Sequence, residues 1–187
     1  MIDLAAARAA LEDHEGLVQH LYLDTQKLPT VGVGCRVFGA QASLQLPWLR
    51  ADGAMPLAAE IAHDYDRVAA MAPGMRPEAY LGPGALFLDK ASVDQLLQVR
   101  LDHEFLPGLR ETFPAFDDGY PGPAQLAIVD MAFNLGVRGL TGGFPHLCAA
   151  VRIGDWSAAA WNCHRKTCRE SRNEWTRDQF LAARAAS

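Results

Sequence analysis

The stretch that decides the fold runs from Glu15 to Thr30, EGLVQHLYLDTQKLPT, and continues directly into VGVG at 31–34. It places two carboxylates and one hydroxyl at fixed intervals, because Asp24 follows Glu15 by nine positions and Thr30 follows Asp24 by six. Enzymes that cut glycosidic bonds commonly use a carboxyl pair, in which one group protonates the leaving oxygen and the other stabilises positive charge or directs water. This stretch can supply both carboxyl groups.

The residues before this stretch have helical periodicity. Ala7 and Leu11 recur at helical spacing behind a candidate N-cap at Asp3, so we expect a helix over about 4–14. Glu15 then lies at the helix end, close to the buried side, where contact with apolar surface would raise the pKa of a carboxyl group and keep it protonated. A simple polar helix terminus is the alternative, and position alone favours it.

Within the stretch the periodicity changes to alternation. Residues 17–37 alternate in polarity and predict short strands joined by a turn at 26–29. Gly32 and Gly34 fall on the face that carries Thr30, so we expect a bare sheet surface that a sugar ring can approach closely. The alternative is that these glycines mark bulges.

The rest of the chain is predicted to be mostly helical, which makes the fold class α+β and predominantly α-helical, with one small N-terminal sheet. Residues 38–54 are expected to form a loop, and 72–84 a flexible connection. A capping box at Ser92 and Gln95 should start the third helix, and Pro107 should end or kink it. The expected helices beyond the sheet cover about 56–71, 92–106, 123–135, 144–153, 156–163 and 172–183.

The apolar helix AQLAIVDMAFNLG at 124–136 belongs in the core, with Gly136 as its C-terminal cap. Phe133 and Asn134 lie at its end and are candidates to face a substrate cleft. For Phe133, plain core packing is an equally good interpretation.

Composition bounds the class of protein. The 187 residues, half of them hydrophobic, can form one domain with a sizeable core, and no run is long enough to span a bilayer. A net charge of −5 argues against broad nucleic-acid binding. Residues 165–177 are locally basic, and we interpret most of these charges as a solvated helix face.

The N-terminus lacks the features of a secretory signal, so we expect synthesis in the cytoplasm and delivery by another system.

The four cysteines are too few and too scattered for a disulfide framework, so free thiols are expected. A bridge between Cys163 and Cys168 is left open. A metal site built from Cys163, His164 and Cys168, with Cys148, ranks below buried thiols and an exposed histidine. We expect neither a metal nor a cofactor.

The order and spacing of Glu15, Asp24, Thr30 and VGVG resemble the active-site segment of T-even phage lysozymes and their glycoside hydrolase relatives. AFNLG at 132–136 looks like the buried-helix motif of that family, and Arg172 with Phe180 fits its C-terminal pattern. With the helix at 92–106 between them, the resemblance spans nearly the whole chain in the correct order.

The resemblance implies a two-lobed lysozyme-like fold with a saccharide cleft, in one catalytic domain over 1–187. The sheet lobe would cover about 15–88 and the helical lobe 1–14 plus 107–187, joined by a helix at 89–106. It also implies a muramidase that cleaves the β-1,4 bond between N-acetylmuramic acid and N-acetylglucosamine in bacterial peptidoglycan, generally with inversion.

By position, Glu15 would be the general acid, Asp24 the second carboxylate, and Thr30 the hydroxyl that holds the attacking water. Arg172 would pair with Glu15. Gly32, Gly34, Phe133 and Asn134 would contact substrate.

The chain departs from the family pattern in several places. Relatives often have glycine at the position of Lys27, histidine at that of Cys35 and a second arginine at that of Asn173. The region 38–84 is longer than in a minimal phage enzyme, and is expected to tune substrate choice or to bind a partner.

Other functions remain open. A lytic transglycosylase would use a single acid/base glutamate without water, and Asp24 and Thr30 argue against it. A catalytically dead saccharide-binding module is a second alternative, which the retained Glu15 and Arg172 argue against. The expected monomer fits either a phage endolysin or an injected antibacterial toxin, and a toxin would have a cognate immunity protein.

Overall fold

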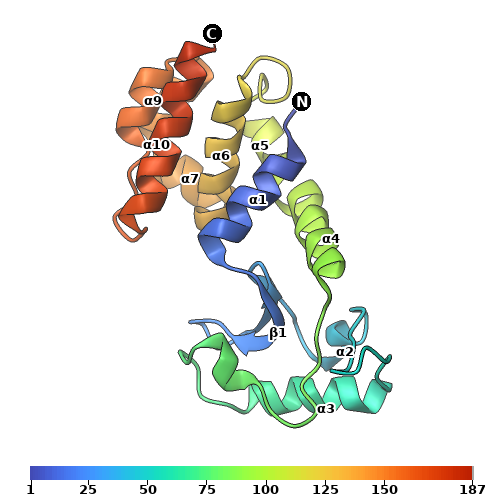
Figure 1. Ribbon diagram of the computed structural model, residues 1–187. Coiled ribbons are helices and arrows are strands. Elements are labelled where there is room, and N and C mark those ends of the chain that lie inside the picture. The colour runs from blue at the N-terminus through green and yellow to red at the C-terminus, as the bar shows by residue number, and fades with distance from the viewer. Residues whose placement is uncertain (187) are drawn as a thin grey trace. The chain divides into compact units, whose positions relative to one another are not determined.

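The computed structural model describes residues 1–186 and divides into two compact units. Unit 1 comprises Met1–His14 and the chain from Val99 onward, and unit 2 comprises Glu15–Gln98. The structure is mostly helical with one small antiparallel sheet, which confirms the predicted α+β class (Figure 1).

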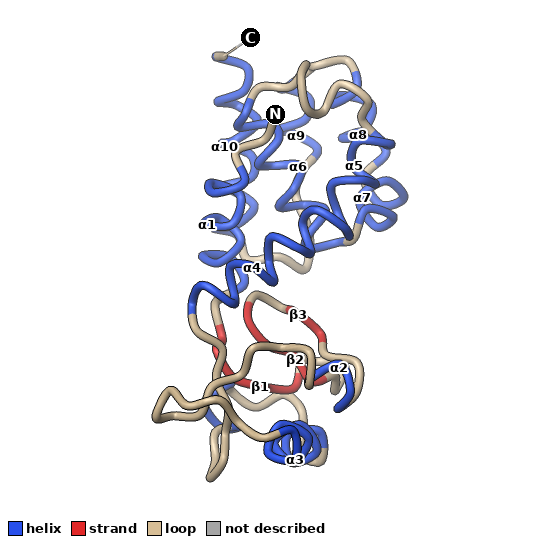
Figure 2. The backbone as a smooth tube through the Cα atoms, turned by 90° about the vertical axis from the view of Figure 1, so that its right-hand side faces the viewer, coloured by secondary structure: helices blue, strands red, loops and turns tan. Residues whose placement is uncertain are grey.

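The sheet of unit 2 is built from the stretch that opens the sequence argument. β1 (Val18–Leu23), β2 (Pro29–Gly32) and β3 (Cys35–Arg36) follow one another in antiparallel order (Figure 2). The short strands were predicted correctly. The unbroken alternation through residue 37 was wrong, because residues 33–34 form a tight turn that pairs Thr30 with Arg36 across the β2–β3 hairpin.

Helical segments complete unit 2. They are α2 (Ala40–Ser43), α3 (Ala58–Ala69), the 3-10 turn η1 (Pro77–Tyr80) and the first residues of α4 (Lys90–Arg100). α3 and η1 both pack against β1, and α3 also contacts α2. The regions expected to be loop and flexible connection therefore each contain an ordered element. Tyr80, for example, is fully buried and donates a hydrogen bond to the carbonyl of Ala72 at 2.9 Å.

Unit 1 is wholly helical in its described part. In Figure 1, α10 lies beside α6 and α9, and it contacts both of them. α7 was not predicted as a separate helix. The helices of unit 1 are α1 (Leu4–Glu15), the π-helical turn η2 (Leu101–Phe105), α5 (Leu106–Thr112), α6 (Gly122–Leu135), α7 (Val137–Gly143), α8 (Pro145–Arg152), α9 (Trp156–Asn162) and α10 (Glu170–Ala185).

The helix predicted at 92–106 differs from the observed one at both ends. Its N-terminus is capped by Asp89, whose Oδ1 accepts the N–H of Ser92 at 2.7 Å, and not by a box at Ser92. Pro107 does not end the helical path, because the π-helical turn directly before it changes the hydrogen-bond pattern and a new α-helix, α5, begins at Leu106. The π-helical turn η2 connects α4 to α5.

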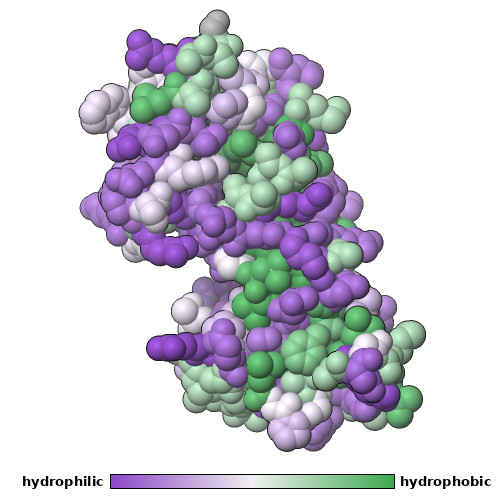
Figure 3. Space-filling model, viewed as in Figure 1, coloured by the Kyte–Doolittle hydropathy of each residue, from purple (hydrophilic) through white to green (hydrophobic). Residues whose placement is uncertain are grey.

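Large exposed apolar side chains occur in both units, with Ile153 and Trp161 among those of unit 1. Figure 3 shows hydrophobic side chains gathered on the visible face of unit 2, whereas the visible face of unit 1 is mostly hydrophilic. Within residues 1–186, no helix has both the length and the apolarity required to cross a membrane. Large exposed apolar side chains of unit 2 are Phe38, Met55, Leu57, Met75 and Leu81.

Candidate functional site

Asp24 organises the turn between β1 and β2. Its Oδ1 accepts the backbone N–H groups of Gln26 at 2.8 Å and Leu28 at 2.9 Å. The backbone closes the same turn, because Asp24 N–H donates to the carbonyl of Leu28 and Lys27 N–H donates to the carbonyl of Asp24, both at 3.0 Å. An aspartate that bonds its own turn in this way is a common loop former. Here it also fixes the orientation of the carboxylate.

Arg36 holds the other oxygen of Asp24. Its Nε donates to Oδ2 at 2.9 Å, and the side chains of Arg36 and Asp24 are 40% and 17% exposed. Sequence reasoning missed Arg36, because only the tight turn at 33–34 returns β3 alongside β2. The carboxylate of Asp24 thus accepts three hydrogen bonds and has a defined direction.

Thr30 is linked to Asp24 through Leu28. The Thr30 hydroxyl donates to the carbonyl of Leu28 at 2.9 Å, while the N–H of Leu28 donates to Asp24. Thr30 is only 1% exposed. Because its single proton is donated to the carbonyl of Leu28, the hydroxyl oxygen is left as an acceptor, and this is the polarity needed to accept a hydrogen bond from a water molecule.

The expected bare glycine face is not what the structure contains. Gly32 ends β2 with φ of +65°, and Gly34 lies in the turn with the same φ, so the two do not share a flat strand face. A Cβ at position 32 would lie 3.2 Å from Cγ1 of Val93 on α4. The space on the Cβ side of Gly32 is therefore occupied by α4, and the substrate contacts expected at Gly32 and Gly34 stay predictions.

Gly32→Ala is expected to destabilise the protein by about 2 kcal/mol, since it adds backbone strain at positive φ and a clash with Val93. The matched control is Gly53→Ala, which also has positive φ (+81°) but has open space around its Cβ position. Urea unfolding should give a clearly larger loss for position 32. Equal losses for the two variants would contradict the close packing of Val93.

Lys27 carries backbone strain in the β1–β2 turn. It is the only residue other than glycine with positive φ (62°) in the described chain, a conformation that costs an ordinary side chain about 1 kcal/mol. Lys27→Gly is expected to raise the free energy of unfolding by about 0.5 kcal/mol, because relief of strain exceeds the added chain entropy of glycine. Urea unfolding measures this, and a loss of stability would show that the turn does not need the left-handed conformation.

Glu15 is the last residue of α1, and Gly16 turns the chain there with φ of +80°. The helix end was predicted within one residue. Its side chain is exposed, whereas Leu11, one turn earlier, is 1% exposed. The expectation that Glu15 lies close to the buried side was therefore wrong. The turn at Gly16 ends the helix before a further turn could cover that side chain.

A buried ionic cluster lies in unit 1, centred on Asp130 of α6. The aspartate is 1% exposed, and His14 Nδ1 donates to its Oδ1 at 2.8 Å. Two arginines contact the same carboxylate and a threonine hydroxyl completes the cluster. The contacts are Arg172 Nε (2.9 Å) and Nη2 (2.8 Å) to Oδ1, and Arg165 Nη1 (2.9 Å) and Thr176 Oγ1 (3.1 Å) to Oδ2.

The pKa of Asp130 reflects these opposing influences. Burial alone would raise it, but hydrogen bonds from His14 and Arg172 and the charges of Arg172 and Arg165 lower it from 3.8 to about 2. The carboxylate therefore stays ionised at neutral pH. It serves as the counter-ion of both buried arginines.

Arg172 was expected to pair with Glu15, and its observed partner in unit 1 is Asp130. The pairing with Glu15 stays a prediction. The interpretation of 165–177 as a solvated face was wrong for two of its basic residues, since Arg165 and Arg172 are 2% and 5% exposed. A sequence signal was present, because Asp130 is a lone acid in an otherwise apolar helix, and buried charges need partners of opposite sign.

Phe133 and Asn134 end α6 as predicted. Phe133 is half-buried and packs against Phe105, with ring centroids 5.0 Å apart. The guanidinium of Arg100 lies 4.8 Å from the centre of the Phe133 ring. This packing accounts for Phe133 without a substrate. Asn134 is exposed, and its contact with substrate stays a prediction.

All four cysteines are free thiols, including Cys163 and Cys168, the pair left open by the sequence. Burial raises the pKa of the Cys163 and Cys148 thiols, which makes them poor nucleophiles. His164 faces Glu170 at 3.2 Å. Among the described residues, no three histidine, cysteine, aspartate or glutamate side chains come close enough to hold a metal ion.

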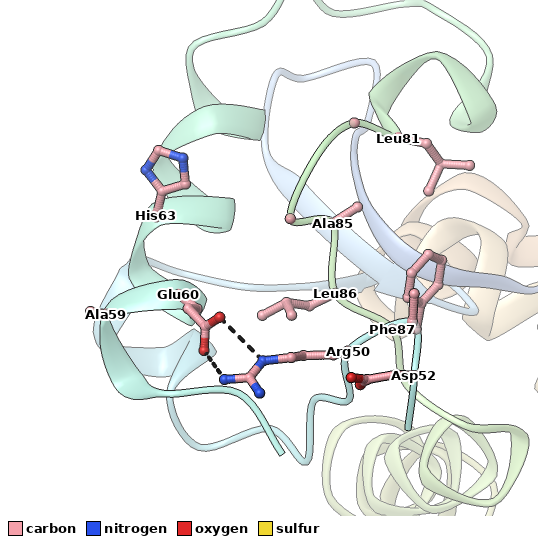
Figure 4. A pocket seen from close by; sticks show the side chains of 12 residues that line it. Arg50, Asp52, Ala59, Glu60, His63, Leu81, Ala85, Leu86 and Phe87 are labelled. Carbon is pink, nitrogen blue, oxygen red and sulfur yellow. Dashed lines mark hydrogen bonds and ion pairs between the residues drawn. The ribbon is translucent and has the colours of Figure 1, made fainter. Parts of the chain in front are cut away.

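Unit 2 also contains an apolar pocket of about 660 Å³. Figure 4 shows Arg50 and Glu60 pointing toward one another beside it, with Nη2 and Oε2 2.5 Å apart. Buried Asp64 holds one wall by accepting the N–H of Leu86 at 3.1 Å. The lining residues are Arg50, Ala51, Asp52, Ala59, Glu60, His63, Leu81, Gly82, Gly84, Ala85, Leu86 and Phe87.

Comparison with known proteins gave no match, either to a protein-family model or to a curated protein.

Proposed function

We propose that the chain is a muramidase, which hydrolyses the β-1,4 bond between N-acetylmuramic acid and N-acetylglucosamine in bacterial peptidoglycan. The proposal includes a lysozyme-like arrangement of two lobes. The observation that carries it is the Asp24 turn, where a carboxylate oriented by three donors is joined through Leu28 to the hydroxyl of Thr30. The order and spacing of Glu15, Asp24 and Thr30 add support.

The proposed roles follow from what each group can donate or accept. Glu15 protonates the leaving oxygen as the glycosidic bond breaks. Asp24 orients the attacking water and stabilises the positive charge that develops on the sugar ring. Thr30 accepts one hydrogen bond from that water, because its own proton is bonded to Leu28. Attack of water from the face opposite the leaving group inverts the anomeric carbon.

The partners in this proposal are peptidoglycan and, if the protein is a delivered toxin, an immunity protein that blocks substrate binding. The enzyme would act on the cell wall after release or injection by another system, and would need no cofactor. Neighbouring genes would separate an endolysin from a toxin, because a toxin gene is accompanied by one for its immunity protein.

The direct test is release of soluble fragments from purified peptidoglycan by the wild-type protein. We expect the turbidity of the suspension to fall and new reducing ends to appear in proportion. Binding to peptidoglycan without either change would contradict the enzymatic proposal and identify a saccharide-binding module.

A further inference from the structure

A single carboxylate joins three separate segments of unit 1. Asp130 on α6 contacts His14 on α1, Arg172 on α10 and, in the α9–α10 loop, Arg165. All of these side chains are at most 7% exposed. Burying so much charge is costly and gives little net stability compared with apolar packing. A cluster of this kind therefore calls for a role beyond holding helices together.

The cluster contacts the C-terminal end of α1 through His14. The ring of His14 is held by Asp130 on one side and by the edge of Trp175 on another, with centroids 4.6 Å apart. The carbonyl of His14 accepts a hydrogen bond from Arg169 Nη2 at 2.6 Å. Both the side chain and the backbone of His14 are thus fixed to α6 and α10.

Glu15 is the next residue in the chain. Consecutive Cα atoms are about 3.8 Å apart across a rigid peptide plane, so fixing His14 at two points also fixes where the backbone of Glu15 starts. Gly16, which follows, has the conformational freedom that His14 lacks. The contacts of His14 therefore bear directly on where the backbone of Glu15 lies.

We propose that Asp130 is a positioning residue, which sets the place of the general acid Glu15 by anchoring His14 at the end of α1. The proposal rests on the proposed function for the role of Glu15, but its structural part stands on the contacts of His14 alone. Displacement of a catalytic group by about 1 Å costs on the order of 10²-fold in rate. Loss of the anchor should thus affect turnover more than substrate binding.

The test compares Asp130→Asn and His14→Phe with the control Ile128→Val. His14→Phe keeps an aromatic ring against Trp175 but removes the donor to Asp130, and it serves where Asp130→Asn folds poorly. Ile128→Val is a buried change on the same helix, at a side chain without polar atoms. Each variant is assayed for kcat and KM on soluble glycan fragments, per folded molecule, and for amide hydrogen exchange at Glu15 and Gly16.

We expect kcat to fall at least 10-fold in Asp130→Asn and His14→Phe with KM within about 2-fold of wild type. Amide exchange at Glu15 and Gly16 should accelerate at least 10-fold, while Ile128→Val changes neither quantity. Unchanged kcat per folded molecule in both variants would overturn the proposal and leave the cluster a purely structural role, whether or not exchange at Glu15 accelerates.

The two proposals fail in different ways. If the wild-type protein does not cleave peptidoglycan, the proposed function falls, but the exchange measurement still decides whether Asp130 fixes the end of α1. If the wild-type protein is active and kcat is unchanged in Asp130→Asn and His14→Phe, the positioning role is contradicted and the muramidase proposal is not.

Discussion

Replacing Glu15 by glutamine is expected to lower the rate of peptidoglycan hydrolysis by about 10²–10⁴-fold, the range that general acid catalysis contributes. The amide keeps the size and much of the polarity of the side chain but cannot release a proton to the leaving oxygen. Because Glu15 is exposed at the end of α1, the substitution should leave the thermal midpoint within about 1 °C of wild type.

The matched control is Asp13→Asn, which removes the same charge from an exposed side chain two positions earlier on the same helix. It should retain wild-type turnover. Equal rates for Glu15→Gln and wild type, measured as new reducing ends, would refute the assignment of the general acid. A loss shared by both variants would point to net charge and not to proton transfer.

Replacing Asp130 by asparagine is expected to lower the free energy of unfolding by about 3–5 kcal/mol, as is typical when one partner of a buried ion pair is removed. The amide leaves Arg165 without the carboxylate that lies 2.9 Å from its Nη1. The control is Asp178→Asn on α10, an exposed aspartate paired with Arg177, which should cost less than about 1 kcal/mol. Similar losses for the two variants in urea unfolding would contradict the buried cluster.

The same residue should shape stability at low pH. The pKa of Asp130 is about 2 in the folded protein against 3.8 for an ordinary aspartate, so its contribution is present above pH 4 and lost as the pH falls from about 4 to 2. The shift corresponds to about 2 kcal/mol. In Asp130→Asn the drop in stability over this pH range should shrink by that amount, whereas an unchanged acid profile would show that Asp130 is not the group responsible.

The sequence predicted those helix ends that are determined by residues close by in the chain. Gly136 ends α6 as expected, and Asp155 caps α9 by accepting the N–H of Ala158. In each case the responsible group lies within a few residues of the structure that it forms.

The features that sequence reasoning missed depend on contacts between distant segments. Arg36 reaches Asp24 only through hairpin pairing, and Gly32 is covered by Val93, some 60 positions later in the chain. Asp130 meets Arg172 across 42 positions, so the basic run looked solvent-exposed when read by itself. Charge and periodicity indicated that these residues were unusual but did not identify their partners.

The measurement that tests the central claim most directly is mass spectrometry of peptidoglycan digested by the wild-type protein in heavy-oxygen water. The muramidase proposal predicts fragments that end in reducing N-acetylmuramic acid carrying one heavy oxygen atom, which form at least about 10²-fold more slowly with Glu15→Gln. Fragments ending in anhydro-muramic acid, formed without uptake of water, would contradict hydrolysis and identify a lytic transglycosylase.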